Sequence, residues 1–302
     1  MAIIITIMNA KTKSLIEIHI AVFLFGFSSI FGKVINQLPV TIVFGRVAFA
    51  AITLGVILLY FKDSFKLKSQ KDYYSLAILG FIFAIHWITF FQSIKVSNIA
   101  IAVITFSTFP IFVTFMEPYV FNEKIRKVDI VISLITFIGI LFVVPEFNLA
   151  NSSTQGALWG IAAGFTCAIL TIYSKKSVEK YSGILVSFYQ CTTAAVILLP
   201  FVFQLRPTLQ KSDILLLGLL GVIFTALSHT LFIKGVKHIK AQLASIIVSL
   251  EPIYGITFAA ILLKEIPTGR TLIGGIIILG SILYASSIHT KKPSLNKISD
   301  HF

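Results

Sequence analysis

The sequence predicts an all-α integral membrane protein with ten transmembrane helices, arranged as two inverted five-helix repeats around a central cavity. Three observations predict this fold. Of the 302 residues, 57% are apolar and 12% are charged, against roughly 25% charged in an average soluble domain. The apolar residues fall in continuous runs of about 20, the length that spans a bilayer as a helix. The two halves of the chain also match at a fixed separation.

The composition excludes several classes of protein. A soluble enzyme or a disordered chain cannot contain this many apolar side chains, because they would form a large exposed apolar surface that aggregates. Continuous apolar runs favour helices over a β-barrel, whose strands alternate apolar and polar residues. The net charge of +13 would suggest a nucleic-acid partner in a soluble protein. In a membrane protein the basic residues line the cytoplasmic loops instead, so we expect a lipid environment and no nucleic acid.

Five runs make up the first half of the chain. They cover residues 15–34, 41–61, 73–94, 98–120 and 128–145. Charged or turn residues fill the gaps, as in the Lys-Asp-Ser sequence at 62–64. The apolar stretch before the first run, residues 2–8, is too short to span a membrane and lacks the flanks of a signal peptide. Met8 is therefore an alternative to Met1 as the first residue.

Five further runs follow an Asn-Ser-Ser turn at 151–153. They cover residues 156–174, 183–203, 213–234, 241–263 and 270–288. The predicted domains are thus a cytoplasmic segment (1–14), a first repeat (15–145), a second repeat (156–288) and a cytoplasmic tail (289–302).

The distribution of Lys and Arg predicts the orientation. With the N-terminus in the cytoplasm, 18 of the 25 basic residues lie in cytoplasmic segments and 6 in outer loops, while Arg46 lies within a span. Because basic residues accumulate on the cytoplasmic side, both termini are predicted to be cytoplasmic. A missed helix would destroy this alternation, so it also supports ten spans.

Several chemically distinctive residues recur 142 positions apart. These pairs are Lys33 and Lys175, Lys95 and Lys237, Pro110 and Pro252, and Glu123 and Glu265. Chance similarity between apolar helices is the alternative, but it would favour Leu and Ile rather than Pro, Glu and Lys. Five is an odd number, so the second repeat enters the membrane from the opposite side. Such an inverted repeat is the architecture of secondary transporters, whose substrate site lies near the midplane.

A proline within a span, followed thirteen residues later by a glutamate at the helix exit, occurs as Pro110 and Glu123 and again as Pro252 and Glu265. With two five-helix halves, residues 14–290 resemble the EamA family of the drug/metabolite transporter superfamily. The resemblance implies an inner-membrane permease for small metabolites, often an exporter of amino acids or other metabolites, with a cavity lined largely by the first four helices of each half. The Met-Glu-Pro sequence at 116–118 departs from this pattern, because small apolar residues are expected there.

Glu251 is the first candidate for a transport residue. It lies near the middle of the 241–263 run, where an ionisable group costs about 2.5–3.5 kcal/mol on insertion scales. Pro252 follows it, and both Pro252 and Pro110 are predicted to break their helices because proline lacks a backbone N–H. A carboxyl group beside freed carbonyls is suited to bind a cationic group or to carry a proton. The alternative is a structural carboxyl group bonded to a neighbouring helix.

Arg46 lies five residues into the 41–61 run from its outer end. Its guanidinium is suited to bind a substrate carboxylate through two parallel hydrogen bonds, and the alternative is a side chain that reaches out to the lipid headgroups. Gln190 is the nearest equivalent in the second half and is predicted to share the same cavity.

His86 and Trp87 lie in the middle of the 73–94 run, and His229 stands 142 residues after Trp87. A histidine can relay protons or accept a hydrogen bond from a substrate, although a buried core histidine is the alternative. Trp87 and Tyr254 are candidates for stacking or a cation–π contact with the substrate, with simple packing as the alternative.

Glu123 and Glu265 are predicted at helix exits on opposite faces, either as gate residues that pair with the other half or in surface ion pairs. The two cysteines, Cys167 and Cys191, lie in apolar runs without metal-ligand spacing, and both are interpreted as core thiols.

Together these features predict a secondary active transporter that moves a small metabolite by alternating access, as a monomer in a bacterial inner membrane. One Arg and one Glu favour an amino acid or a related amphoteric substrate. Coupling is expected to be to protons, through Glu251 and His86, or to exchange, because the chain lacks a Gly-rich phosphate loop. No cofactor and no metal are expected. A passive channel or lipid flippase is the alternative, and a membrane-embedded enzyme is a weaker one because clustered His and Asp are missing.

Overall fold

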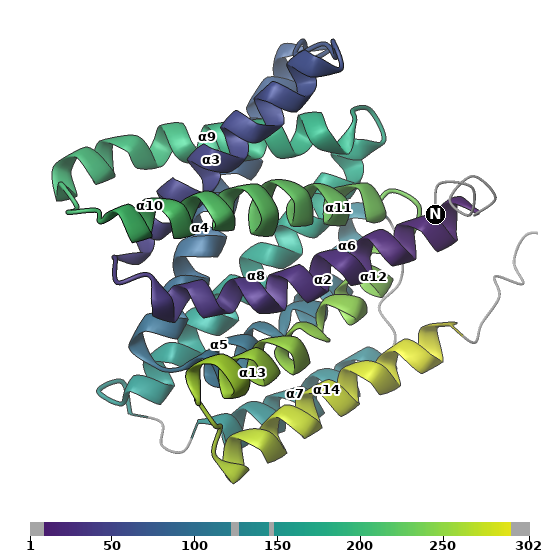
Figure 1. The fold of residues 1–302 in the computed structure, drawn as a ribbon. Coiled ribbons are helices and arrows are strands. Elements are labelled where there is room, and N and C mark those ends of the chain that lie inside the picture. Colours follow the sequence, from purple (N-terminus) through teal and green to yellow (C-terminus); the bar gives the residue numbers. More distant parts are fainter. Residues whose placement is uncertain (1–8, 122–126, 145–147, 291–302) are drawn as a thin grey trace, which may run out of the picture.

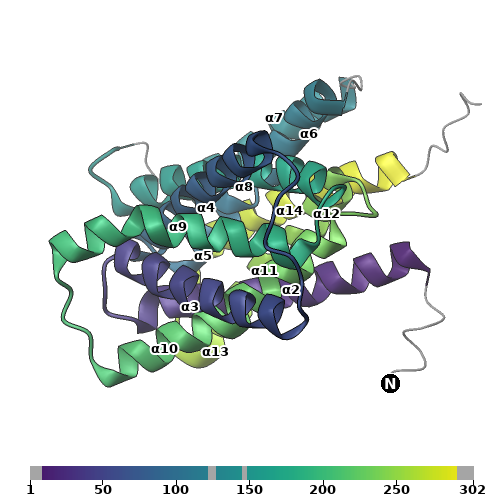
Figure 2. The same cartoon turned by 90° about the horizontal axis from the view of Figure 1, so that it is seen from above.

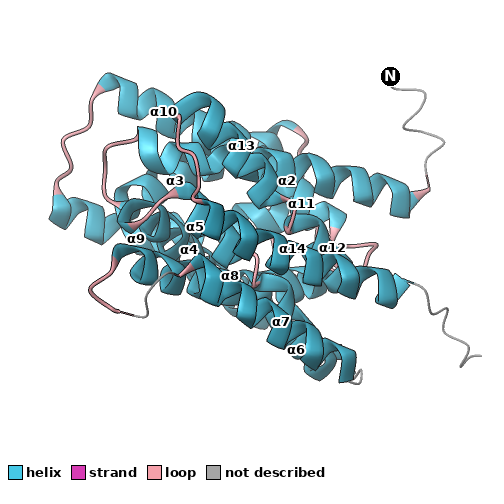
Figure 3. Ribbon diagram, turned by 90° about the horizontal axis from the view of Figure 1, so that it is seen from below, coloured by secondary structure: helices cyan, strands magenta, loops and turns pink. Residues whose placement is uncertain are grey.

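The computed structural model describes residues 9–121, 127–144 and 148–290. Within these ranges the chain forms helices joined by loops, without a strand (Figures 1 and 3). The helices lie side by side and make ten crossings, so the predicted all-α fold is confirmed. The beginning of α2 and the end of α14 lie on the same side of the molecule (Figure 1). We call this side the N-terminal face and the other side the opposite face.

The first half makes five crossings. Their helices are α2 (Ala10–Val34), α3 (Pro39–Tyr60), α4 (Gln70–Val96), α5 (Ile99–Phe106) with α6 (Phe109–Phe121), and α7 (Lys127–Val143). Several helices begin where a side chain satisfies a free backbone N–H. Asn9, Ser69 and Asn98 cap α2, α4 and α5 in this way, and α3 begins with Pro39, which has no N–H to satisfy.

The second half repeats this order. Its helices are α8 (Ser152–Val178), α9 (Gly183–Leu205), α10 (Lys211–Gly221) with the π-helix η1 (Val222–Leu227) and α11 (Ser228–Gly235), α12 (Ala241–Val248) with α13 (Glu251–Leu263), and α14 (Gly269–Thr290). Among the described residues, eight crossings are long and apolar enough to span a membrane, and shorter apolar helices at 130–143 and 269–281 complete the ten.

Two of the predicted continuous runs, 98–120 and 241–263, are broken helices. Segment α5 ends at Phe106 and segment α12 ends at Val248, and each of these residues stands four positions before a proline. A proline cannot donate a hydrogen bond to the carbonyl four residues earlier, and its ring clashes with that carbonyl. The helices therefore stop at equivalent points of the two repeats, near the middle of the membrane.

The packing of the helices is unchanged when the two halves are exchanged. Helix α4 packs along α8, and its counterpart α11 packs along α2. Likewise α5 and α6 pack on α8, whereas α13 and α12 pack on α2. The second helices, α3 and α9, contact each other (Figure 2), as do the last helices, α7 and α14 (Figure 1). This arrangement confirms the predicted inverted repeat and places the third and fourth crossings of each half against the other half.

Close contact between α8 and α5 depends on Gly160. A Cβ atom at this position would collide with the Thr105 hydroxyl and lie 3.1 Å from the backbone oxygen of Ala102. The hydroxyl can rotate but the backbone cannot, so we expect Gly160→Ala to lower the free energy of unfolding by about 1–3 kcal/mol. Thermal unfolding of the purified protein measures this loss.

Gly280→Ala is the matched control. It lies in α14, and a Cβ atom there would have nothing within 4 Å. Alanine is the better helix former by roughly 1 kcal/mol, so Gly280→Ala should unfold at the same temperature as the natural protein or a higher one. Equal losses in the two variants would show that the α8–α5 contact does not limit stability.

Candidate substrate cavity

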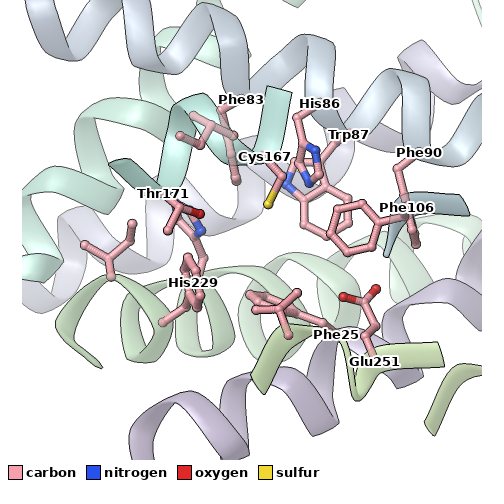
Figure 4. Close-up of a pocket in the computed structure, with 14 residues that line it drawn as sticks. Phe25, Phe83, His86, Trp87, Phe90, Phe106, Cys167, Thr171, His229 and Glu251 are labelled. Atoms are coloured by element: carbon pink, nitrogen blue, oxygen red, sulfur yellow. The ribbon is translucent and has the colours of Figure 1, made fainter. Parts of the chain in front are cut away.

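A narrow cavity lies at mid-depth between the two halves. It is lined by the third crossing of each half together with the first and fourth. The lining residues are Phe25, Phe83, His86, Trp87, Phe90, Phe106, Cys167, Leu170, Thr171, His229, Phe232, Ile233, Val248 and Glu251 (Figure 4). The centre of a water molecule can occupy a volume of about 30 Å³ in this cavity, so the cavity holds one or two waters. The cavity must therefore widen before it admits a metabolite.

The internal repeat relates the two sides of this cavity. Four pairs of lining residues stand 142 positions apart, namely Phe25 and Cys167, Trp87 and His229, Phe90 and Phe232, and Phe106 and Val248. The cavity thus lies on the pseudo-two-fold axis that exchanges the halves. A site on such an axis is placed symmetrically with respect to the two membrane faces, as alternating access requires.

Glu251 is the acidic residue of the cavity. It is the first residue of α13 and 3% exposed, and its carboxyl group points into the cavity (Figure 4). In the part of the chain that the structure describes, no group hydrogen-bonds this carboxyl. The N-terminus of α13 favours negative charge nearby, but one helix end does not replace the solvation that burial removes. A bound cation or a proton would supply the missing partner.

Each of the two histidines that line the cavity keeps one ring nitrogen as a hydrogen-bond acceptor. The Nδ1 atom of His86 lies 3.0 Å from the carbonyl oxygen of Ala163. Since a carbonyl only accepts, Nδ1 carries the proton and Nε2 keeps its lone pair. The Nε2 atom of His229 lies 2.7 Å from Oε1 of Gln190 and donates to it. Gln190 in turn donates to Ser174, so Nδ1 of His229 keeps the free lone pair.

Aromatic rings form most of the remaining wall. Phe25 meets Trp87 edge to face with 6.3 Å between ring centroids, and Trp87 meets Phe90 in the same way at 5.6 Å. The indole Nε1 of Trp87 is buried and has no hydrogen-bond partner among the described residues. Aromatic faces attract cations within about 6 Å of the ring centroid. A carboxyl group, two imidazole acceptors and aromatic rings together suit a ligand with a cationic group.

Arg46 supports the cavity from behind and does not line it. Its side chain is fully buried, and its guanidinium carbon lies 3.4 Å from the ring centroid of Trp87. Its Nε donates to the Thr225 hydroxyl at 2.9 Å, and Nη2 donates to the carbonyl oxygen of Phe224 at 3.2 Å. Both partners belong to η1. The guanidinium therefore fixes Trp87 against a π-helix, a feature that is frequent at functional sites.

The structure brings four of the predicted substrate residues together: His86, Trp87, His229 and Glu251 line one cavity. Gln190 stands behind His229, whereas Tyr254 is half-buried on α13 and packs against Phe23. Pro110 and Pro252 stand second in α6 and α13. The described residues contain no cluster of metal-binding side chains, and the absence of a metal stays a prediction.

Some of the residues that line the cavity were not predicted from the sequence. Cys167, interpreted as a core thiol, faces the cavity, as do Phe25, Phe90 and Phe106. A signal for these residues existed, because each stands 142 positions from another lining residue. This signal does not stand out in the sequence, because the chain contains 28 phenylalanines and most apolar side chains in a membrane protein face lipid or other helices.

Glu265, one of the two candidate gate residues, does not line the cavity. Glu265 lies beyond the end of α13 at the opposite face and accepts a hydrogen bond from the backbone of Ile99. Glu123 lies outside the described residues. Glu117, which departs from the pattern expected of the EamA family, is 7% exposed and accepts a hydrogen bond from the backbone of Ala241.

These observations define a polytopic integral membrane protein whose inverted repeats enclose a mid-depth cavity. The model of the EamA-like transporter family matches residues 12–144 and again residues 154–287. The chain therefore belongs to the EamA-like transporter family, and the resemblance seen in the sequence is confirmed.

Individual relatives agree with this assignment. The uncharacterized inner membrane transporter YicL of Salmonella typhimurium is 28% identical, over 92% of this chain and 97% of its own length. The uncharacterized transporter YxxF of Bacillus subtilis is 25% identical, over 86% and 83%. An S-adenosylmethionine uptake transporter of Rickettsia conorii is 23% identical, over 85% of each chain. A solved structure with 14% identity and a TM-score of 0.69 covers 93% of this chain and 99% of its own, and it shares the fold.

Proposed function

We propose that this protein is a secondary active transporter that carries a small metabolite with a cationic group across a bacterial inner membrane. An amino acid or a related amphoteric compound is the proposed substrate class. The observation that carries the proposal is the carboxyl group of Glu251, which is buried, lacks a hydrogen-bond partner among the described residues, and opens into an aromatic cavity on the axis of the repeat.

The chemistry of the cavity supports a cationic ligand. The carboxylate and the free imidazole nitrogens of His86 and His229 are acceptors, so they pair with the donors of an ammonium group. Phe25 and Phe90 offer aromatic rings, whose faces hold a cation whether or not it carries protons. The relatives named as S-adenosylmethionine uptake transporters fit this class, because S-adenosylmethionine combines a sulfonium cation with an amino-acid group.

The proposed mechanism is alternating access. The halves rock against each other so that the cavity opens to one face at a time. In the empty carrier Glu251 takes up a proton, and the arriving cation displaces it, which couples transport to protons. Exchange of one substrate molecule for another is the alternative form of coupling, with a second cation in the place of the proton.

A thermal-shift screen of the purified protein tests the substrate class. The library should contain amino acids, amines, S-adenosylmethionine and neutral or anionic metabolites of similar size. A ligand at 100 times its Kd stabilises the folded state by about 2.7 kcal/mol, so stabilisation by cationic or amphoteric compounds is expected. The same compounds should leave Glu251→Gln unaffected. Stabilisation by anions alone would overturn the proposal.

A further inference from the structure

Two short helices of the broken crossings begin at equivalent positions on opposite faces. Helix α5 begins at Ile99 on the opposite face, and α12 begins at Ala241 on the N-terminal face. The two positions are 142 residues apart. The first N–H groups of any helix lack a partner within the helix, and the helix dipole gives this end a partial positive charge. Each of these two ends therefore attracts an acceptor, and best of all an anionic one.

In both places the acceptor is a glutamate from the other half of the protein. The N–H of Ile99 donates to Oε1 of Glu265 at 2.6 Å, and the N–H of Ala241 donates to Oε1 of Glu117 at 3.2 Å. Glu265 follows the end of α13 in the second half, and Glu117 lies near the end of α6 in the first half. Each bond thus ties the fourth crossing of one half to the fourth crossing of the other, at one membrane face.

Lysines reinforce both places. At the N-terminal face Lys175, near the end of α8, lies 3.6 Å from Glu117. At the opposite face its repeat equivalent Lys33 donates to the carbonyl oxygen of Ser97, in the turn that leads into α5. The sequence counterpart of Glu265 is Glu123, which lies outside the described residues, and the described bond to α12 is made by Glu117, six residues earlier. The acid that departs from the family pattern thus gives the start of α12 the same kind of acceptor that α5 has.

We propose that Glu265 and Glu117 are two latches that close the cavity, Glu265 at the opposite face and Glu117 at the N-terminal face. This inference rests on the proposed alternating access. In the conformation described here both bonds are made, which agrees with a cavity that has room for one or two waters. For the cavity to open toward one face, the latch at that face must release its helix end while the other latch holds.

Cys167 provides a reporter for this proposal. It lines the cavity, and the chain contains one other cysteine, Cys191. In a Cys191→Ala background, an impermeant cationic thiosulfonate can be added from either side of reconstituted vesicles, and the rate of Cys167 modification measures how far the cavity is open to that side. The measurement needs no substrate. A negative result would therefore overturn the proposal made for the two glutamates while transport itself remains intact.

Replacing either latch with alanine removes its acceptor. We expect Glu265→Ala to raise the rate of Cys167 modification about tenfold from the opposite face and to leave the rate from the N-terminal face unchanged. Glu117→Ala should do the reverse. The glutamine variants keep an acceptor oxygen but lose the charge, so they should give smaller changes of the same sidedness. They also serve if an alanine variant does not fold.

Glu179→Ala is the matched control, because Glu179 is an exposed acid near the N-terminal face that takes no part in either latch. It should label as the natural protein does. Increases from the same face in both latch variants, or no increase beyond that of Glu179→Ala in the alanine and glutamine series, would overturn the proposal.

Discussion

Glu251→Gln is expected to reduce transport by about 10- to 100-fold, which corresponds to the loss of a charge-assisted interaction worth about 1.5–3 kcal/mol. Glutamine has nearly the same shape as glutamate, but it can neither neutralise a cation nor release a proton. Initial uptake rates in proteoliposomes, measured with the ligand found by thermal shift, give the size of the loss.

Protein stability separates this effect from misfolding. Glu251 is buried and its carboxyl group has no hydrogen-bond partner in the described structure, so an amide of nearly the same shape leaves no other protein group unpaired. We expect Glu251→Gln to unfold at the same temperature as the natural protein or at a higher one. Glu179→Gln, which changes an exposed acid, should retain transport. Normal transport by Glu251→Gln would exclude Glu251 from the mechanism.

Arg46→Lys is expected to lower the free energy of unfolding by about 2 kcal/mol, roughly the value of one or two hydrogen bonds from a charged group. Lysine keeps the positive charge, so the cost of burying a cation remains. It lacks the planar fork that reaches Thr225 and the carbonyl of Phe224 while lying flat on the ring of Trp87, and the two residues are not interchangeable at such a site.

Tryptophan fluorescence tests whether Arg46→Lys changes the surroundings of Trp87. The chain contains two tryptophans, and Trp159 is 41% exposed on α8. In a Trp159→Phe background, emission reports on Trp87 alone. We expect Arg46→Lys to change this emission, to lower the unfolding temperature by several degrees and to slow transport about tenfold. Unchanged emission and stability would show that Arg46 does not hold Trp87 in place.

The sequence predicted the fold because its signals come from the bilayer itself. Apolar runs, basic loops and the 142-residue repeat are imposed by membrane thickness, orientation and symmetry. The proline positions also located the breaks, because the carbonyl that each proline cannot bond belongs to Phe106 or Val248, where α5 and α12 end. Histidine, tryptophan and glutamate near mid-span indicated the cavity, since ionisable groups at that depth face protein or water.

Other features required coordinates because they depend on side-chain direction. Arg46 lies at a depth from which a side chain can turn toward the headgroups or into the protein, and the interior route depends on carbonyl and hydroxyl partners in η1. The π-helix itself has no proline or glycine within Val222–Leu227 to mark it. Glu117, which accepts the bond from α12, does not stand 142 residues from Glu265, so alignment at a constant separation cannot show that the two acids have equivalent roles.

The central claim is that one cavity binds substrate and faces the two sides of the membrane in turn. Counterflow tests it most directly. Proteoliposomes are loaded with an excess of the unlabelled ligand and diluted into a trace of the labelled form. A carrier exchanges the two, so we expect a transient accumulation of label above equilibrium in the natural protein and none in Glu251→Gln. A flux that rises in proportion to concentration and never exceeds equilibrium would identify a passive channel and contradict the account.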